Sequence, residues 1–250
     1  MSGTWTIFRR ELAGMFFGPL AWVLLCAALV LNGALFVLYV NDPSGQGDVD
    51  TALALALGDS IPYWAMMIVL PPLLTMRMIS EESRSGLLEF LLTAPVSDRA
   101  VVLGKLLAAT AVMALLLASS LFYGLAVTLL GAAPDWPVLL GAYGGAVLTS
   151  ALFCGIGLVA SAGTSTPLLA AFLAFVANIV LLLLPFLKDL AGASPENWRG
   201  AVFRRIDVIS RLRGSFTMGV IDSSHVVFFL VWTAFCVFLA TRLVESRRWR

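Results

Sequence analysis

The side chains best suited to chemistry lie in one short stretch, Ile79 to Lys105, with the sequence "ISEESRSGLLEFLLTAPVSDRAVVLGK". Carboxylates and basic groups alternate there around a leucine stripe. They could act as acid and base, bind phosphate, or pair with charges on a partner protein. The charged residues of the stretch are Glu81, Glu82, Arg84, Glu89, Asp98, Arg99 and Lys105.

Phosphate binding by a P-loop is excluded. That motif needs glycine, four residues, then Gly-Lys-Ser/Thr, so that backbone amides surround the phosphates. At Gly104-Lys105, Arg99 stands where the first glycine should be, and Leu106 stands where Ser or Thr should follow. ATP hydrolysis is therefore not expected on this chain, which is predicted not to be an enzyme.

Catalytic and metal-binding sets are missing from the rest of the sequence as well. Cys26, Cys154 and Cys236 each lie in an apolar run without CxxC spacing, which is typical of small core residues. The single histidine, His225, is expected to be a solvated or capping residue. No acidic residue lies deep in an apolar run, which disfavours a proton or sodium relay. We expect no cofactor and no metal on this chain.

The composition is that of a membrane protein. Hydrophobic residues make up 60% of the 250 residues and charged residues 12%, against about 45–50% and about 25% in soluble proteins. The net charge of +1 argues against nucleic-acid binding, which rests on a concentrated basic surface.

Six apolar stretches are long enough to cross a bilayer, for which a helix needs roughly 20 residues. The third is longer than necessary and should tilt or project, and Pro71-Pro72 should kink the second. We therefore expect a single all-α transmembrane domain over 1–250. Its spans are predicted at about 20–40, 61–78, 101–131, 137–160, 167–187 and 226–243.

The basic residues indicate the orientation, because Lys and Arg near span ends favour the cytoplasm. They precede span one, lie between spans two and three, and follow span six, whereas the loops after spans one and three carry acid and no Lys or Arg. We expect a multi-pass protein of the bacterial inner membrane with both termini in the cytoplasm. The loop 188–225 is expected on the extracytoplasmic side, yet it is basic too, so either the count is off by one span or this loop has its own structure. We keep six spans and expect an interfacial helix there, with Val202, Phe203, Ile206 and Ile209 on one face.

Two shorter helices are expected on the cytoplasmic side. Residues 4–17 predict an amphipathic helix in the membrane plane, with an aromatic and apolar face opposite its charged residues. In residues 80–95, the leucine stripe defines a helix too short to span, which Pro95 ends. Its charges are either merely solvated or border an apolar ridge that docks on a soluble partner. The first helix carries Trp5, Phe8, Leu12 and Phe16 on the apolar face, and Arg9, Arg10 and Glu11 on the other.

Polar side chains within the spans have two interpretations. Interhelical hydrogen bonding is the general one, and lining of a substrate path is the specific one. Our candidates for the path are Asn32, Ser120, Thr149 and Asn178. Gly141 and Gly145, continued by Thr149, form a small-residue face that allows close packing, within the chain or between subunits.

A resemblance selects among these interpretations. The stretch "EESRSGLLEFLLTAPVSDRAVVLGKLLA" resembles the segment of ABC-2 type transporter permeases in which a charged cluster, Gly, a Glu-Leu-Leu helix, Pro and "LGK" recur in that order. The stretch "GVIDSSHVVFFLVWTAFCVFLATRLVESRRWR" is similar to the last span and tail of the gliding-motility-associated permeases. His225 departs from that pattern, because relatives often carry an acidic residue there.

The resemblance implies a half-transporter. Two six-helix subunits, identical or close paralogues, would enclose a path, most often for export, and two copies of a separate ATPase subunit would bind ATP and magnesium. Residues 4–17 would be the connecting helix, with Trp5, Phe8, Arg9, Arg10 and Leu12. Residues 80–95 would hold the coupling helix, with an ATPase contact formed by Glu81, Glu82, Arg84, Gly86, Leu88, Glu89 and Leu92.

The alternative is a membrane scaffold that anchors an ATPase-containing assembly and transmits force without moving cargo. An intramembrane enzyme is a third possibility, but the spans carry no paired Asp, Ser-Lys or His-Glu arrangement.

Overall fold

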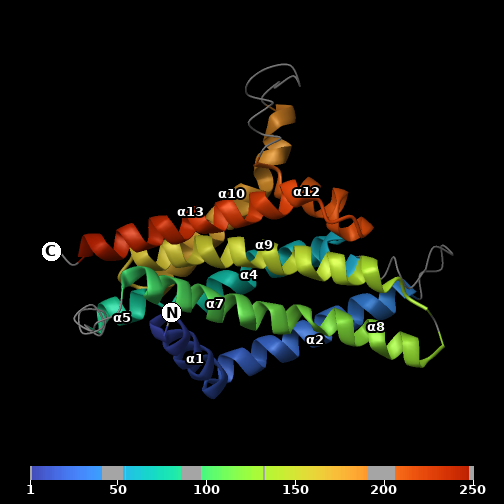
Figure 1. Cartoon of the computed structure of the whole chain (residues 1–250), viewed down its shortest axis with the longest axis horizontal. Coiled ribbons are helices and arrows are strands. Elements are labelled where there is room, and N and C mark those ends of the chain that lie inside the picture. Colours follow the sequence, from blue (N-terminus) through green and yellow to red (C-terminus); the bar gives the residue numbers. More distant parts are fainter. Residues whose placement is uncertain are drawn as a thin grey trace.

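The computed structural model describes residues 2–40, 53, 55–85, 97–131, 133–190 and 206–247, and every regular element in these ranges is a helix (Figure 1). The elements are α1 (Ser2–Phe17), α2 (Pro19–Val40), η1 (Leu55–Asp59), α4 (Ile61–Thr75), α5 (Ser80–Arg84), α7 (Asp98–Leu117), α8 (Ser119–Leu129), α9 (Trp136–Gly163), α10 (Pro167–Leu190), α12 (Val208–Gly214), η2 (Phe216–Met218) and α13 (Ser223–Arg247).

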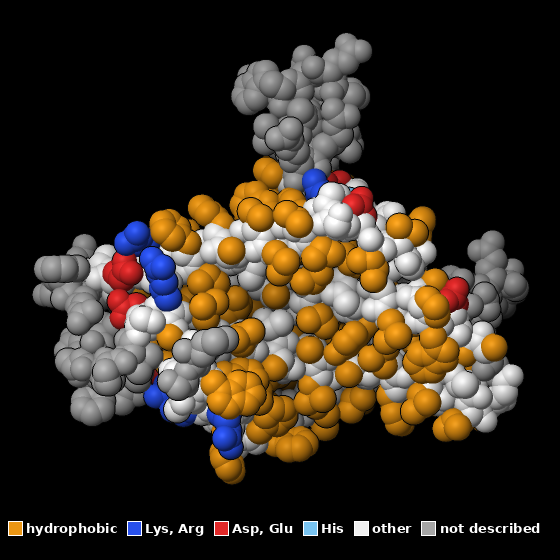
Figure 2. Space-filling view, in the orientation of Figure 1, with side chains coloured by type: hydrophobic (Ala, Val, Ile, Leu, Met, Phe, Trp, Pro, Cys, Tyr) orange, Lys and Arg blue, Asp and Glu red, His pale blue; other side chains and the backbone are white. Residues whose placement is uncertain are grey.

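Six segments are long and apolar enough to cross a membrane, which confirms the all-α fold with six spans. Five of them begin and end within three residues of the predicted bounds, while the second, Ile61–Arg84, ends six residues beyond the predicted 78. Hydrophobic side chains cover the flanks of the bundle, while charged ones gather near its ends (Figure 2). The six segments are Ala21–Leu38, Ile61–Arg84, Asp98–Leu129, Trp136–Gly163, Pro167–Phe186 and Ser223–Ser246.

Helix α9 is the centre of the bundle, because it packs against α4, α7, α10 and α13. Small residues make these contacts close. A Cβ atom placed on Gly155 would lie 3.0 Å from Cβ of Cys236 on α13, and one on Gly157 would lie 2.1 Å from Oγ1 of Thr75 on α4. Any larger residue at Gly157 would therefore push α4 away from α9.

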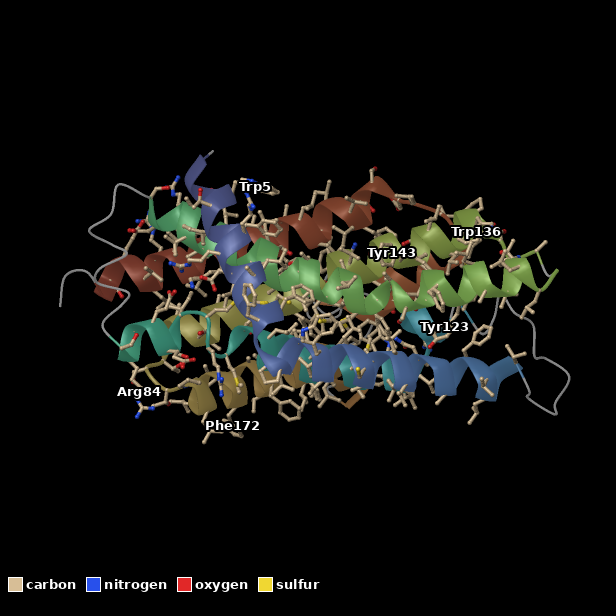
Figure 3. All side chains as sticks on the ribbon, turned by 90° about the horizontal axis from the view of Figure 1, so that it is seen from below. Trp5, Arg84, Tyr123, Trp136, Tyr143 and Phe172 are labelled. Atoms are coloured by element: carbon tan, nitrogen blue, oxygen red, sulfur yellow. The ribbon has the colours of Figure 1, made fainter. Side chains whose placement is uncertain are left out.

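The long third span, Asp98–Leu129, continues through Ala118, which separates α7 from α8 but keeps αR backbone and the helical hydrogen bonds to Ala114 and from Phe122. Helix α2 is hydrogen-bonded to α8. Asn32 Nδ2 donates to Ser119 Oγ at 2.9 Å. The hydroxyl of Tyr123, whose side chain is labelled in Figure 3, donates to the Leu29 carbonyl at 2.9 Å. Buried polar groups need such partners, so these two bonds fix the register of α2 against α8.

One end of the bundle is closed by η1, α12 and η2, and we call it the cap end. Val208 and Leu212 are the buried residues of α12, while Ile206 and Ile209 of the expected interfacial face are only partly buried. Val202 and Phe203 lie outside the described residues. The described part of this loop is therefore packed onto the bundle, since α12 and η2 contact both α9 and η1.

The opposite end carries both chain termini, and we call it the junction end (Figure 1). Helix α4 continues through Pro71 and Pro72 and ends at Thr75. A turn at 76–79 then leads into α5. Helix α1 crosses the bundle beside α7 and meets α2 at Gly18 (Figure 3).

Candidate functional site

Four charged side chains meet inside the junction end, and we call them the ionic cluster. Lys105 of α7 is fully buried, and its Nζ lies 3.0 Å from Glu11 Oε1 and 2.9 Å from Glu82 Oε1. Arg10 Nη2 lies 2.6 Å from Glu11 Oε1 and 3.1 Å from Glu82 Oε1. Two cations and two carboxylates thus join α1, α5 and α7, which are far apart in the sequence.

The cluster is balanced because each cation contacts both carboxylates. A buried Lys without a partner would be expensive, since the effective desolvation penalty is several kcal/mol per ion. Burial lowers the pKa of Arg10, but the hydrogen bonds and charges of Glu11 and Glu82 raise it more, so the net pKa lies above its usual value. Arg10 therefore stays charged.

Gly104 explains how α1 comes close enough to reach Lys105. A Cβ atom at Gly104 would lie 2.8 Å from Cγ2 of Ile7 and 3.0 Å from the Thr4 carbonyl oxygen. Only glycine fits this contact. Gly104 and Lys105 thus act together: the first allows α1 to pack against α7, and the second pairs with Glu11, one turn beyond Ile7.

Ser161 of α9 holds the turn between α4 and α5. Its Oγ accepts from the Ile79 and Ser80 amides, each at 3.1 Å, and donates to the Met76 carbonyl at 3.1 Å. The Ser80 hydroxyl also donates to the Met76 carbonyl. Backbone groups outside a regular helix are satisfied in this way by a buried hydroxyl. The start of α5 is therefore tied to α9 as well as to α7.

The residues expected at the ATPase contact do not all face outward. Glu81 and Arg84 are exposed, whereas Glu82 belongs to the ionic cluster and its side chain is only 12% exposed. The Oε2 atom of Glu82 is buried without a hydrogen-bond partner among the described residues. The remaining expected contacts, Gly86, Leu88, Glu89 and Leu92, lie outside the described residues.

The charged face of α1 differs from its expected form. Glu11 is turned toward Lys105, not outward with Arg9, because the buried ammonium attracts it. Trp5 is 61% exposed and stacks on Phe8, with ring centroids 5.1 Å apart (Figure 3). Phe8 and Leu12 pack partly against the core.

The four candidate path residues are all buried, but they differ in their partners. Asn32 donates to Ser119, and the Thr149 hydroxyl donates to the Gly145 carbonyl of its own helix at 2.8 Å. Ser120 and Asn178 have no hydrogen-bond partner in the described part of the chain. Asn32 thus serves an interhelical contact, whereas the polar atoms of Ser120 and Asn178 are not satisfied by the described part of the bundle.

The small-residue face of α9 packs within the chain. A Cβ atom at Gly145 would lie 2.5 Å from Cγ of Phe216 in η2, and one at Gly141 would lie 3.3 Å from the Phe216 carbonyl oxygen. At least this part of the small-residue face therefore contacts η2 of the cap end and not another subunit.

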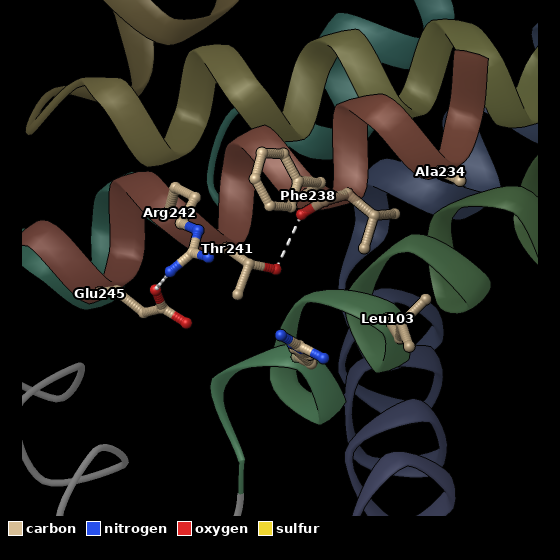
Figure 4. A pocket seen from close by; sticks show the side chains of 8 residues that line it. Leu103, Ala234, Phe238, Thr241, Arg242 and Glu245 are labelled. Atoms are coloured by element: carbon tan, nitrogen blue, oxygen red, sulfur yellow. Dashed lines mark hydrogen bonds and ion pairs between the residues drawn. The ribbon is translucent and has the colours of Figure 1, made fainter. Parts of the chain in front are cut away.

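A small cleft of about 260 Å³ separates α7 from α13 at the junction end (Figure 4). Arg99 and Leu103 line one side, while Phe238 and Arg242 line the other. Arg242 Nη1 is paired with Glu245 Oε2 at 2.8 Å. Its guanidinium lies 5.1 Å from the centre of the Phe238 ring. No group of three or more metal-ligating side chains occurs among the described residues.

A family model described as ABC-2 family transporter protein matches residues 5–245. No curated protein matches the chain. Because the match covers nearly the whole sequence, the chain belongs to the ABC-2 transporter family. It is therefore a multi-pass membrane permease subunit of an ABC transporter, and an associated ATPase follows from that family. The narrower resemblance to the gliding-motility permeases stays a prediction.

Proposed function

Proceeding from membership of the ABC-2 family, we propose that two copies of this chain, or this chain and a close paralogue, form the path of an exporter. Two copies of a separate ATPase subunit drive it and bind the ATP and magnesium. The junction end and both termini face the cytoplasm of a bacterial inner membrane. The ionic cluster carries this proposal, because it links the start of the partner-facing segment to the membrane helices.

Transmission follows from the contacts of α5. A force applied to α5 acts on Glu82, which is paired with Lys105 of α7 and with Arg10 of α1. The same force acts on the turn at 76–79, which Ser161 ties to α9. Helices α1, α7 and α9 therefore move with α5. Closure of the ATPase pair would change the tilt of the spans in this way.

The orientation is supported by the position of the basic groups. Arg77, Arg84 and Arg99 follow or precede spans at the junction end, as the preference of Lys and Arg for the cytoplasmic side requires. Single cysteines at Ser85 and Met218 test it, in a background where the exposed Cys26 is replaced by Ala. A membrane-impermeant maleimide should label Met218→Cys in intact cells and leave Ser85→Cys unlabelled; the reverse pattern contradicts the proposal.

Arg84 offers the sharpest test of the ATPase contact, because it is exposed and no ion pair of the described residues involves it. We expect Arg84→Glu to lower co-purification of the ATPase roughly tenfold, as reversing one interfacial charge can do. Arg213→Glu, on the exposed side of α12 at the cap end, is the matched control and should retain the ATPase. Equal co-purification of the ATPase with both variants would show that the ATPase does not bind at α5.

Glu82→Gln tests transmission separately from docking. The variant should still retain the ATPase, because Glu82 lies inside the junction. It should lower cargo-stimulated hydrolysis, because Lys105 loses one of its two carboxylates. Unchanged stimulation would exclude the ionic cluster from transmission. Hydrolysis that depends on this chain, with no cargo moved in vesicles, would favour the scaffold instead.

A further inference from the structure

A groove of about 840 Å³ opens at the elbow between α1 and α2 and reaches across to α4 and α5. Its volume lies in the range of ligand sites, about 300–1,000 Å³. One wall is apolar and includes Met15, Val23, Leu73 and Leu74, while the rim toward α5 is charged. Arg10, Glu11 and Glu82 of the ionic cluster lie on this rim, whereas Arg84, the residue chosen above to test the ATPase contact, does not line the groove.

The position of the groove matches the boundary between headgroups and acyl chains. Helix α1 crosses the bundle (Figure 3), and an amphipathic helix in that position lies at this boundary. The apolar wall continues along α2 and α4, which span the membrane. A molecule in the groove would thus have a polar end at the rim and an apolar tail along the two spans.

The charges of the rim determine which polar group of a bound molecule fits there. Glu11 and Glu82 are occupied by Lys105 and Arg10. The remaining ionic groups are Arg77 and Glu81, whose nearest N and O atoms are 3.9 Å apart and whose side chains are 65% and 59% exposed. A pair this long and this exposed contributes little to stability, so a ligand can replace it at small cost.

We propose that the groove binds a phospholipid with a zwitterionic headgroup that ends in a primary ammonium. Arg77 binds the phosphate, for which guanidinium geometry is suited. Glu81 accepts a hydrogen bond from the ammonium. A trimethylammonium headgroup carries the same charge but has no N–H to donate, so the site discriminates between the two. The lipid is a resident ligand of the junction, not the cargo, and its binding does not require the ATPase.

Gly14 keeps the groove open. It lines the groove, and a Cβ atom there would meet no heavy atom within 4 Å. Gly14→Leu therefore places a side chain in open space and also favours the helix. Gly144 of α9 is the matched control, because its Cβ would also meet nothing within 4 Å and it lies away from the groove.

Native mass spectrometry of the full-length chain in mild detergent tests the proposal. The probes are phosphatidylethanolamine, phosphatidylcholine and phosphatidylglycerol with identical acyl chains, in equal amounts. Wild type and Gly144→Leu should bind the ethanolamine lipid about tenfold better than the choline lipid, as one charge-assisted hydrogen bond predicts. Gly14→Leu should lose most of the bound lipid.

Two rim variants keep the test independent of any effect on folding, because both side chains are exposed. Glu81→Gln should bind ethanolamine and choline lipids equally, and Arg77→Gln should bind less of both. Full lipid retention by Gly14→Leu, equal binding of the two zwitterionic lipids by wild type, or a preference for the glycerol lipid would each overturn the proposal.

Discussion

The junction end and the cap end of the bundle are held by different forces. At the junction end, four charged side chains join α1, α5 and α7, and Lys105 at their centre is fully buried. At the cap end, Phe216 and Leu212 insert against Gly145, and the Trp64 indole donates to the Gly58 carbonyl at 3.1 Å. The His225 ring lies 2.8 Å from Ser215 Oγ, a hydrogen bond that adds to this packing.

This difference suits the two ends for different tasks. Close-packed contacts fall off steeply with separation, so a packed cap resists displacement. Ion pairs weaken more gradually with distance, and two cations shared by two carboxylates can exchange partners during a small movement. The packing of the cap end is therefore suited to keeping the spans in register, and the ion pairs of the junction end are suited to the transmission through α5 that we propose.

Replacement of Lys105 should have the largest effect on the stability of the protein. Lys105→Met leaves Glu11 and Glu82 with only Arg10 between them, and an uncompensated buried charge costs about 3–5 kcal/mol. We expect a corresponding loss in the free energy of unfolding, measured by denaturant titration in detergent, and faster proteolysis within α1.

A charge-balanced double variant controls for lost packing. Lys105→Met combined with Glu11→Gln leaves one carboxylate and one guanidinium, and it should recover most of the lost stability, because apolar replacement of a balanced buried pair is often neutral. A double variant as unstable as Lys105→Met would mean that shape, and not charge, holds the junction.

The stability contributed by the cap end should depend on side-chain size and not on charge. A Cβ atom at Gly145 would lie 2.5 Å from Phe216 and 2.8 Å from Leu212, so Gly145→Ala should lower stability by about 1–3 kcal/mol through overpacking. Gly144→Ala is the control, because its Cβ would meet nothing. Protease sensitivity of α1 should not change in either variant; exposure of α1 in Gly145→Ala would show that the two ends are not independent.

The fold could be predicted from the sequence because hydropathy is a local property. Each span contains a long apolar run, so its approximate position follows from composition. The hydrogen bonds between α2 and α8 could not be predicted in the same way, because the Asn32 and Tyr123 contacts depend on how two separate spans pack against each other.

The ionic cluster was missed because its members are distant in the sequence. Glu11 and Lys105 are 94 positions apart, and the amphipathic pattern of residues 4–17 placed Glu11 on the outer face. One signal was available: Lys105 follows a glycine within an apolar helix, where a buried ammonium requires a carboxylate. Glu82 was expected on the partner-facing surface for a related reason, since the leucine pattern of residues 80–95 does not determine which side of the segment faces α7.

Replacement of Arg10 should have the smallest effect on stability. Its salt dependence, compared with that of Lys105→Met, distinguishes the exposed part of the ionic cluster from the buried part. The Arg10 side chain is 45% exposed, while that of Lys105 is fully buried. Solvent screening therefore limits the loss in Arg10→Gln to about 1 kcal/mol or less. Added salt should reduce this loss further, because exposed pairs are screened at a Debye length of about 8–10 Å. The loss in Lys105→Met should hardly depend on salt. Unfolding of both variants at low and high salt measures this, and equal salt dependence would show that water reaches Lys105 and that the centre of the junction is not dry.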